Sequence, residues 1–277
     1  MSLSEADFTF VRDLVRERSA ISLDESKAYL VDARLKPIAQ EQQISLSELA
    51  SELRLRRRGP LADRIVEAMT TNETSWMRDG HPFESLRAEV IPSLAAARSV
   101  GPINIWSAAC SSGQEPYCLA MIIADDFPHL RSRVRIVATD ISEEVLAKGR
   151  AGEYSQLEVN RGMAAPLLMK HFTRKGTRWV VNDDLRKMVE FRPHNLAGSY
   201  LGLPKADLVL IRNVLIYFEL EMKRRILDNI RDTMSPDGWL LLGASETAIG
   251  IDASYERVQV GRTTFYRPLG AAVRRAS

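Results

Sequence analysis

A run of short side chains between a predicted strand and a predicted helix has the residue types of a ligand site. The segment Trp106–Glu115 reads WSAACSSGQE, and its small residues would let the backbone approach a bound molecule closely. Asp140 ends the next predicted strand, at a position where an acidic side chain commonly binds ribose hydroxyls. Together these residues predict a site for a nucleotide-type ligand.

The kind of nucleotide depends on Glu115, which falls in the first turn of the predicted helix. NAD would favour a G-x-G-x-x-G loop and a helix start free of negative charge, because its pyrophosphate binds there. A carboxylate suits a ligand that carries an ammonium, a sulfonium and ribose hydroxyls, so S-adenosylmethionine is favoured. One alternative stays open: Gly113 only makes a tight turn, and Asp140 only caps the helix before Ser142.

The overall composition is that of a globular protein. Of the 277 residues, 45% are apolar and 27% are charged, and the net charge of +2 is too small to indicate nucleic-acid binding. The two cysteines and four histidines show no metal-ligand spacing, so no metal is expected. The sequence has no signal-peptide pattern and no apolar run of about 20 residues that could span a bilayer. We therefore expect a cytoplasmic protein without direct membrane insertion.

Apolar residues at helical spacing predict a small all-α domain over residues 1–70, with four helices. Ser2 and Glu5 have the spacing of a capping box for the first of them. Residues 71–95 are expected to connect this domain to the rest of the chain and to carry part of the ligand site.

Residues 96–270 alternate between apolar strands and helices, which predicts an α/β fold with a parallel, Rossmann-like sheet. A turn is expected at Ser235–Gly238, and Gly261 is expected at the tip of a terminal antiparallel hairpin. Residues 271–277 are predicted to be a disordered tail. The strands are expected at 103–107, 134–139, 207–211, 239–242, 255–260 and 263–267.

Four segments resemble the CheR family of chemotaxis receptor methyltransferases, in order and in spacing, over nearly the whole chain. They are TTNETSWMRD at 70–79, WSAACSSGQEPY at 106–117, ATDIS at 138–142 with AGEY at 151–154, and IRNVLIYF at 211–218 with GASE at 243–246. The chain departs from the usual family pattern at Trp76-Met77, Ala109 and Gln114, none of which has an assigned chemical task.

The resemblance implies transfer of methyl groups from S-adenosylmethionine to glutamates on the cytoplasmic helices of chemoreceptors, leaving S-adenosylhomocysteine. It implies that Glu115 binds the cofactor's amino group and Asp140 its ribose, with Arg78 and Tyr217 nearest the transferred methyl. The complete set of implied cofactor-binding residues is Asn72, Thr74, Arg78, Glu115, Asp140, Asn195, Leu196, Asn213 and Val214.

A glutamate acceptor is already ionised at neutral pH, since its pKa is about 4.3, so the enzyme would need no general base. Arg78 is then the natural group to orient the acceptor, because a guanidinium matches a carboxylate in two-point contacts. The alternatives are that Arg78 forms an ordinary ion pair with a neighbouring acidic residue and that Tyr217 only packs at a strand end. Cys110 is expected to be a buried small residue, and His194 a structural one.

The receptor is expected to meet basic residues of the helical domain. The family resemblance places Arg34 and Lys36 at the substrate-contacting position, whereas Arg54–Arg58 could equally be a solvated charged surface. A small β-subdomain is expected at about 168–192. Its loop has Gly176 alone in place of the family's Gly-x-Gly loop, which predicts that methylation does not depend on the receptor's carboxyl-terminal pentapeptide. The enzyme is expected to be a monomer.

The sequence leaves two other functions open. The chain could be a binding module that holds the cofactor and signals without catalysis, although the retained site residues argue against this. It could also methylate a small molecule or RNA, but the near-neutral charge and the lack of an aromatic platform make RNA an unfavourable substrate.

Overall fold

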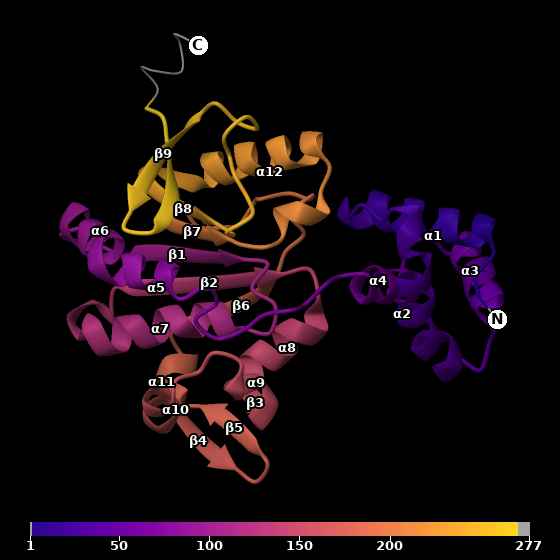
Figure 1. The fold of residues 1–277 in the computed structure, drawn as a ribbon, viewed down its shortest axis with the longest axis horizontal. Coiled ribbons are helices and arrows are strands. Elements are labelled where there is room, and N and C mark those ends of the chain that lie inside the picture. Colours follow the sequence, from indigo (N-terminus) through magenta and orange to yellow (C-terminus); the bar gives the residue numbers. More distant parts are fainter. Residues whose placement is uncertain (1, 271–277) are drawn as a thin grey trace.

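The computed structural model describes residues 2–270 and places a helical domain beside a larger α/β domain (Figure 1). The predicted tail at 271–277 lies outside the described residues. The helical domain contains α1 (Glu5–Ser19), the 3-10 turn η1 (Glu25–Lys27), α2 (Ala28–Glu41), α3 (Leu46–Leu55) and α4 (Pro60–Ala68). None of the helices in residues 2–270 is long and apolar enough to cross a membrane.

Helical spacing of apolar residues builds the core of this domain, because it places them on one side of each helix. Leu14 of α1, Leu35 of α2 and Leu49 of α3 are among the fully buried members of one cluster. The predicted capping box at Ser2 is wrong because the chain becomes helical only at Glu5. Ser4 caps the helix there, and its hydroxyl accepts the amide hydrogen of Asp7.

The larger domain is built on a seven-stranded sheet with the order β6-β2-β1-β7-β8-β10-β9. The first five strands are parallel, and β10 and β9 form the predicted antiparallel hairpin. This confirms the α/β fold class. The strands are β1 (Ile103–Ala108), β2 (Val134–Asp140), β6 (Val189–Pro193), β7 (Ala206–Ile211), β8 (Met234–Leu242), β9 (Tyr255–Val260) and β10 (Thr263–Pro268).

Alternating side chains of the strands point to opposite faces of the sheet, and each face is covered by helices. Leu208 and Leu210 of β7 pack in the cluster with α7, whereas Val209 and Ile211 pack in the cluster with α12. Both faces are therefore buried. The helices of this layer are α5 (His81–Ser85), the π-helical turn η2 (Leu86–Val90), α6 (Ile91–Ala97), α7 (Gln114–Asp126), η3 (Pro128–Leu130), α8 (Glu143–Ala151), η4 (Leu215–Tyr217) and α12 (Leu220–Thr233).

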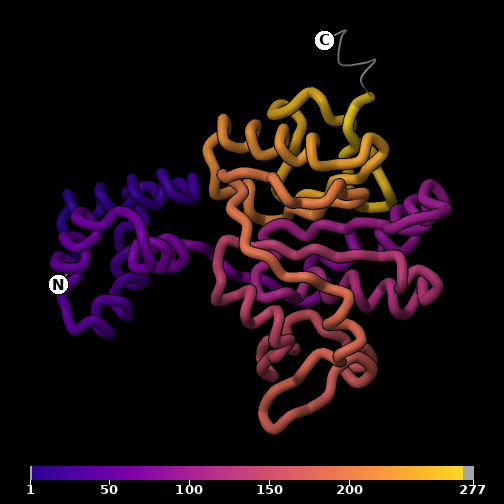
Figure 2. The backbone as a smooth tube through the Cα atoms, turned by 180° about the vertical axis from the view of Figure 1, so that it is seen from behind, coloured from indigo at the N-terminus to yellow at the C-terminus, as the bar shows by residue number. Residues whose placement is uncertain are grey.

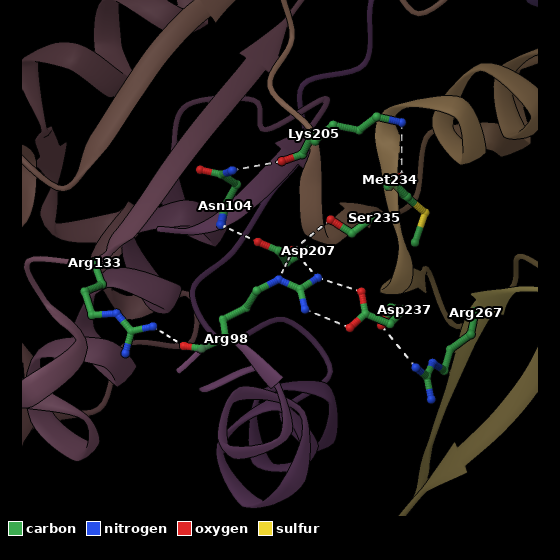
Figure 3. Close-up of polar contacts among 9 residues, drawn as sticks. All are labelled: Arg98, Asn104, Arg133, Lys205, Asp207, Met234, Ser235, Asp237 and Arg267. Carbon is green, nitrogen blue, oxygen red and sulfur yellow. Dashed lines mark hydrogen bonds and ion pairs between the residues drawn. The ribbon is translucent and has the colours of Figure 1, made fainter. Parts of the chain in front are cut away.

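A polar network around the buried Asp207 joins the amino ends of β1, β7 and β8 (Figure 3). The Asp207 carboxylate accepts hydrogen bonds from Arg98 at 2.7 and 3.0 Å, from the Ser235 hydroxyl at 2.8 Å and from the Asn104 amide at 2.9 Å. Arg98 also pairs with Asp237 at 2.6 and 2.7 Å. The predicted strand begins earlier than expected, at Met234: Ser235–Gly238, predicted as a turn, lies within β8 but pairs with no residue of β7, because the pairing passes from Ala206–Met234 to Leu208–Trp239.

A second, three-stranded sheet forms the predicted inserted subdomain (Figure 1). Its order is β3-β5-β4, and Gly176 lies in the tight loop between β4 and β5 with a positive φ of 58°. The strand β3 lies before the predicted range of 168–192, and the end of that range forms β6 of the large sheet. The subdomain elements are β3 (Glu153–Ser155), α9 (Gln156–Asn160), α10 (Ala165–His171), β4 (Phe172–Lys175), β5 (Arg178–Val181) and α11 (Asp183–Arg186).

The helical domain stands at the edge where the parallel strands end, and the chain crosses from it in an extended segment (Figure 2). Hydrogen bonds tie the two domains together: the Ser22 amide donates to the Tyr217 carbonyl at 2.9 Å, and Asn195 donates to the Arg18 carbonyl at 2.7 Å. Across the same junction, Glu67 of α4 accepts the Glu144 amide of α8 at 2.8 Å. The carboxyl ends of the strands are thereby covered by a second domain.

Candidate active site

A cleft lies at the carboxyl ends of β1, β2 and β7, beneath the helical domain. It holds about 910 Å³ of empty space, part of it open to solvent. Separate segments of the chain bring every predicted cofactor-binding and catalytic residue to this one cleft. Its lining includes Asn72, Thr74, Arg78, Glu115, Asp140, Asn195, Leu196, Asn213, Val214 and Tyr217.

The loop after β1 folds into a tight, unusual backbone conformation. Ala109 and Ser111 have positive φ angles of 54° and 51°, which L-residues adopt at a cost of about 1–3 kcal/mol each. Asp140 compensates by accepting the Ser111 amide at 2.8 Å and the Ser142 amide at 3.0 Å. The helix-cap alternative is wrong, because Ser142 caps α8 by accepting the Val145 amide, whereas Asp140 holds the loop and lines the cleft. Its burial raises the pKa of this carboxyl group.

The loop after β7 is fixed by Glu246, to which the sequence analysis gave no role. Its carboxylate accepts the amides of Asn213 and Gly243 at 2.7 Å and of Val214 at 2.9 Å. A Cβ at Gly243 would come within 2.6 Å of Glu246 and 2.7 Å of the Asn213 nitrogen, so only glycine fits. Asn213 itself has a φ of 57°, and its buried Oδ1 has no hydrogen-bond partner among the described residues.

A buried guanidinium lies under the cleft, at a position that the sequence analysis missed. Arg212 donates to Glu115 at 3.0 Å, to Asp79 at 2.7 Å and to the Arg78 carbonyl at 3.0 Å, and its side chain is 2% exposed. The Ser107 hydroxyl binds the other Glu115 oxygen at 2.8 Å. One signal was available, because an arginine that ends an apolar strand must find a carboxylate if it is buried.

Arg78 lies half-buried in the cleft wall without an acidic partner. Its guanidinium donates at 3.3 Å to the Glu73 carbonyl, and it forms no ion pair with any residue in 2–270. The predicted alternative, an ion pair with a neighbour, is not found, because Asp79 pairs with Arg212 and Glu73 pairs with Arg161. Tyr217 is also half-buried, and its hydroxyl has no hydrogen-bond partner in the described part of the chain. Both polar groups are thus available to a ligand.

Three further residues that line the cleft, Asn195, His194 and Cys110, are held by neighbouring groups or buried among them. The Asn195 side chain bonds the Arg18 carbonyl and the Ala197 amide, so it has few hydrogen bonds left for a ligand. His194 contacts Trp106 and Tyr200 edge to face, and burial lowers its pKa. Cys110 is buried as expected, and its burial raises the thiol pKa, which is the opposite of what a nucleophile requires.

The two predicted substrate-binding residues lie outside the cleft lining and differ from each other. Arg34 donates to the Met69 carbonyl at 2.7 Å and to the Thr71 hydroxyl at 3.2 Å, so it holds the segment that leads to Asn72. Lys36 is exposed, with no ion pair or hydrogen bond from its side chain among residues 2–270. In the Arg54–Arg58 cluster, Arg54 pairs with Asp7 and Arg57 with Glu17.

Comparisons with known proteins follow the division into two domains. The family model "CheR methyltransferase, all-alpha domain" matches residues 6–70, and "CheR methyltransferase, SAM binding domain" matches residues 72–264. The chain belongs to the CheR methyltransferase family. As a member of it, the protein is a methyltransferase that uses S-adenosylmethionine, which confirms the predicted family and cofactor.

Several CheR relatives match nearly the whole chain. "Chemotaxis protein methyltransferase 1" of Pseudomonas aeruginosa is 45% identical over 96% of this chain and 99% of the relative. "Chemotaxis protein methyltransferase Cher2" of Pseudomonas putida is 42% identical over 96% and 99% of the two chains. A "Chemotaxis protein methyltransferase" of Vibrio parahaemolyticus is 39% identical over 96% and 98%.

The groups in the cleft of this CheR protein fit S-adenosylmethionine chemically. Arg212 neutralises only one of the two carboxylates that it bonds, Glu115 and Asp79, so the cluster keeps a negative charge that favours a cationic ligand. The buried Oδ1 of Asn213 has no partner in residues 2–270, and such an acceptor suits an amino or hydroxyl donor. The negatively charged cluster and the unpaired Asn213 oxygen fit a ligand such as S-adenosylmethionine, which carries both positive charge and hydrogen-bond donors.

Proposed function

We propose that this CheR protein methylates the γ-carboxylates of glutamates on the cytoplasmic helices of chemoreceptors, giving methyl esters for chemotactic adaptation. The names of the relatives support a role in chemotaxis. The observation that carries the carboxylate assignment is Arg78, a guanidinium that lines the cleft and has no acidic partner among residues 2–270. A glutamate side chain of the substrate would supply that partner.

The reaction requires mainly that the acceptor carboxylate be aligned with the methyl group of the cofactor. When bound, S-adenosylmethionine supplies a methyl group activated by a positively charged sulfur. Arg78 would hold the acceptor carboxylate in a two-point contact, and Tyr217 would donate its hydroxyl hydrogen to it and exclude water. Such alignment supplies up to roughly 7–11 kcal/mol in favourable systems. No proton has to be removed from an ionised carboxylate, which agrees with a cleft that offers no activated thiol.

We assign the cofactor's parts to the cleft by the same reasoning. Glu115 would bind the ammonium and Asp140 the ribose hydroxyls, each fixed by hydrogen bonds to its neighbours. Asn213 would accept a hydrogen bond through its unpaired Oδ1. The surrounding contacts would come from Asn72, Thr74, Arg78, Asn195, Leu196 and Val214, which line the same space.

Receptor docking is proposed at the helical domain, through Lys36. This lysine is exposed and has no side-chain partner among residues 2–270, whereas Arg34 is committed to the chain segment at Met69–Thr71. Arg34 would then act mainly by holding that segment in place. Lys36→Glu should raise KM for the receptor, with Lys187→Glu on the α/β domain as the control.

Because the acceptor helices are cytoplasmic, we place the enzyme in the cytoplasm, and we expect it to work as a monomer.

We also propose that methylation does not need a carboxyl-terminal receptor peptide. The loop between β4 and β5 contains only Gly176 and Thr177, too few residues for the Gly-x-Gly loop of the peptide-binding type. Initial methylation rates should therefore be equal for a receptor with its natural tail and for one lacking the last five residues. A large loss of rate on removing the tail would contradict this part of the proposal.

The main experiment identifies the acceptor. The enzyme is incubated with methyl-labelled S-adenosylmethionine and a receptor cytoplasmic fragment, and the label is then released with mild base. Volatile label released from glutamate positions is expected for a carboxyl methyl ester. Cofactor binding without label on any receptor would instead indicate a binding module, and base-stable label would indicate another acceptor.

A further inference from the structure

The buried Arg212 touches both halves of the site. Toward the cofactor half it donates from one terminal nitrogen to Glu115 at 3.0 Å. Toward the acceptor half its other terminal nitrogen donates to the Asp79 carboxylate at 2.7 Å and to the Arg78 carbonyl at 3.0 Å. A single planar group therefore sets the distance between Glu115 and the Arg78–Asp79 backbone.

The position of Glu115 depends on this contact. Arg212 holds one carboxylate oxygen of Glu115 and the Ser107 hydroxyl holds the other, so the side chain cannot turn without breaking a charge-assisted bond. Each oxygen accepts one bond from these partners and keeps further acceptor capacity. That capacity is what an ammonium group would use.

The backbone around Arg78 depends on Arg212 as well. Met77 and Asp79 have positive φ angles of 44° and 69°, which side-chain-bearing residues keep only when the surroundings hold them. The two hydrogen bonds from Arg212, to the Arg78 carbonyl and the Asp79 carboxylate, hold the turn at residues 77–79 in this conformation. In addition, the Arg212 guanidinium lies 5.7 Å from the Phe83 ring centroid, so Phe83 helps to hold the guanidinium in position.

We propose that Arg212 is a positioning residue that aligns the ammonium-binding Glu115 with the acceptor-orienting Arg78. The inference rests on the proposed function, because it takes Glu115 as the site of the cofactor's ammonium and Arg78 as the acceptor's partner. Arg212 acts through these two residues and does not touch the reacting atoms. Its loss therefore misplaces both ends of the site while leaving the adenosine pocket in place.

A pair of ligands separates this role from a merely structural one. S-adenosylhomocysteine carries the ammonium, and 5′-methylthioadenosine lacks the whole amino-acid end. Calorimetric titration of Arg212→Gln should show S-adenosylhomocysteine bound about tenfold more weakly, because Glu115 is no longer held where it meets the ammonium. The affinity for 5′-methylthioadenosine should stay within about twofold. Equal weakening of both ligands, or loss of both through misfolding, would overturn the proposal.

A double variant tests whether Arg212 acts through Glu115. If it does, Arg212→Gln combined with Glu115→Gln should bind S-adenosylhomocysteine hardly more weakly than Glu115→Gln alone, because the effects of coupled residues do not add. Fully additive losses would overturn the proposal. Arg212→Lys keeps the charge but not the fork, and it should recover part of the affinity.

The acceptor half is tested separately with Asp79→Asn, which keeps a residue type that tolerates a positive φ. This variant should bind S-adenosylhomocysteine like the wild type and transfer methyl about tenfold more slowly. Unchanged transfer would overturn the acceptor half of the proposal. If wild-type enzyme binds S-adenosylhomocysteine but methylates no receptor, the proposed function fails, and the two-ligand titration still decides the role of Arg212.

Discussion

The two ends of the parallel sheet each carry an arginine held by two acidic side chains, and the two clusters differ in how completely their hydrogen bonds are satisfied. At the amino end, Arg98 bonds Asp207 and Asp237 (Figure 3), and no polar atom of these side chains is buried without a partner. At the carboxyl end, Arg212 bonds Glu115 and Asp79. There the described residues include three buried, unpartnered atoms: the Nε of Arg212, the Nε2 of His194 and the Oδ1 of Asn213.

Backbone geometry divides the two ends in the same way. The carboxyl end contains Ala109, Ser111 and Asn213 at positive φ, and the Arg98 cluster contains no such residue. Unsatisfied groups and strained backbone both cost free energy, and a sheet can tolerate them only where other contacts compensate. The comparison indicates that the amino end stabilises the fold and that the carboxyl end is prepared for ligands. Four substitutions test this division.

Asp207→Ala should have the largest effect, and on stability alone. It leaves Arg98 without its buried partner, which should lower the free energy of unfolding by about 3 kcal/mol. Urea denaturation measures this loss, and the exposed Asp184→Ala is the control. The affinity of the folded variant for S-adenosylhomocysteine should stay unchanged. A fall in affinity comparable to the loss of stability would contradict the conclusion that the amino end of the sheet serves stability and the carboxyl end serves binding.

Arg78→Ala should have the reverse effect. Transfer to the receptor should fall about hundredfold, the scale seen when one oriented donor is removed, while S-adenosylhomocysteine binding falls only a few-fold. The free energy of unfolding should change by less than about 0.5 kcal/mol, because Arg78 makes no ion pair in residues 2–270. Single-turnover assays and titrations separate the two quantities. Equal losses of binding and transfer would show that Arg78 mainly holds the cofactor.

Gly243→Ala should weaken cofactor binding by about tenfold. The added methyl group would push against the Glu246 carboxylate and the Asn213 backbone nitrogen. It would so shift the loop that carries the unpaired Oδ1 of Asn213. Gly270→Ala is a matched control, because a Cβ there meets nothing within 4 Å. If Gly243→Ala bound the cofactor normally, the loop after β7 would be less rigid than its bonds to Glu246 indicate.

The smallest expected effect concerns pH and His194. Burial lowers the pKa of this imidazole, so between the two pKa values the unfolded chain binds more protons than the folded protein. The contribution to stability is therefore complete above about pH 6.5 and is lost as the pH falls through the folded-state pKa. Urea stability measured from pH 7.5 to 5.5 should fall less steeply in His194→Phe, by under about 1 kcal/mol. The exposed His129→Phe should keep the wild-type slope.

The sequence was informative where residue type alone decides the outcome. The short residues of Trp106–Glu115 and the acidic Asp140 could be assigned to one site from their types and spacing, and the motif around Asn213 from the family resemblance. Residues of all three line one cleft. The positions of Arg212 and Glu246 relative to their partners could not be predicted, because those partners come from distant segments that only the folded sheet brings together. The bonds of Arg212 to Asp79 and Glu115 cross 133 and 97 residues of the chain.

Two errors in the predicted elements have the same kind of cause. Ser235–Gly238 has the composition of a turn and pairs with no residue of β7, but its bonds to Asp207 and Arg98 keep it within the bounds of β8. The edge strand β6 was missed because only Val189 and Phe191 mark its buried face, and Pro193 ends it. In both segments, tertiary contacts outweigh a short local pattern.

The roof and floor of the cleft belong to different domains, so a movement of one domain against the other would change the cleft. Ser19 and Ile21 of the helical domain line the space whose floor is the sheet. The junction is held by hydrogen bonds at Ser22, Asn195 and Glu67, by the Arg16–Glu219 ion pair and by the packing of Ile21 against the core of the α/β domain. If the two domains open and close on the cleft, the apparent affinity for the cofactor equals the affinity of the closed form multiplied by the closed fraction. By reciprocity, a receptor helix that favours closure tightens cofactor binding by the same factor by which the cofactor tightens receptor binding.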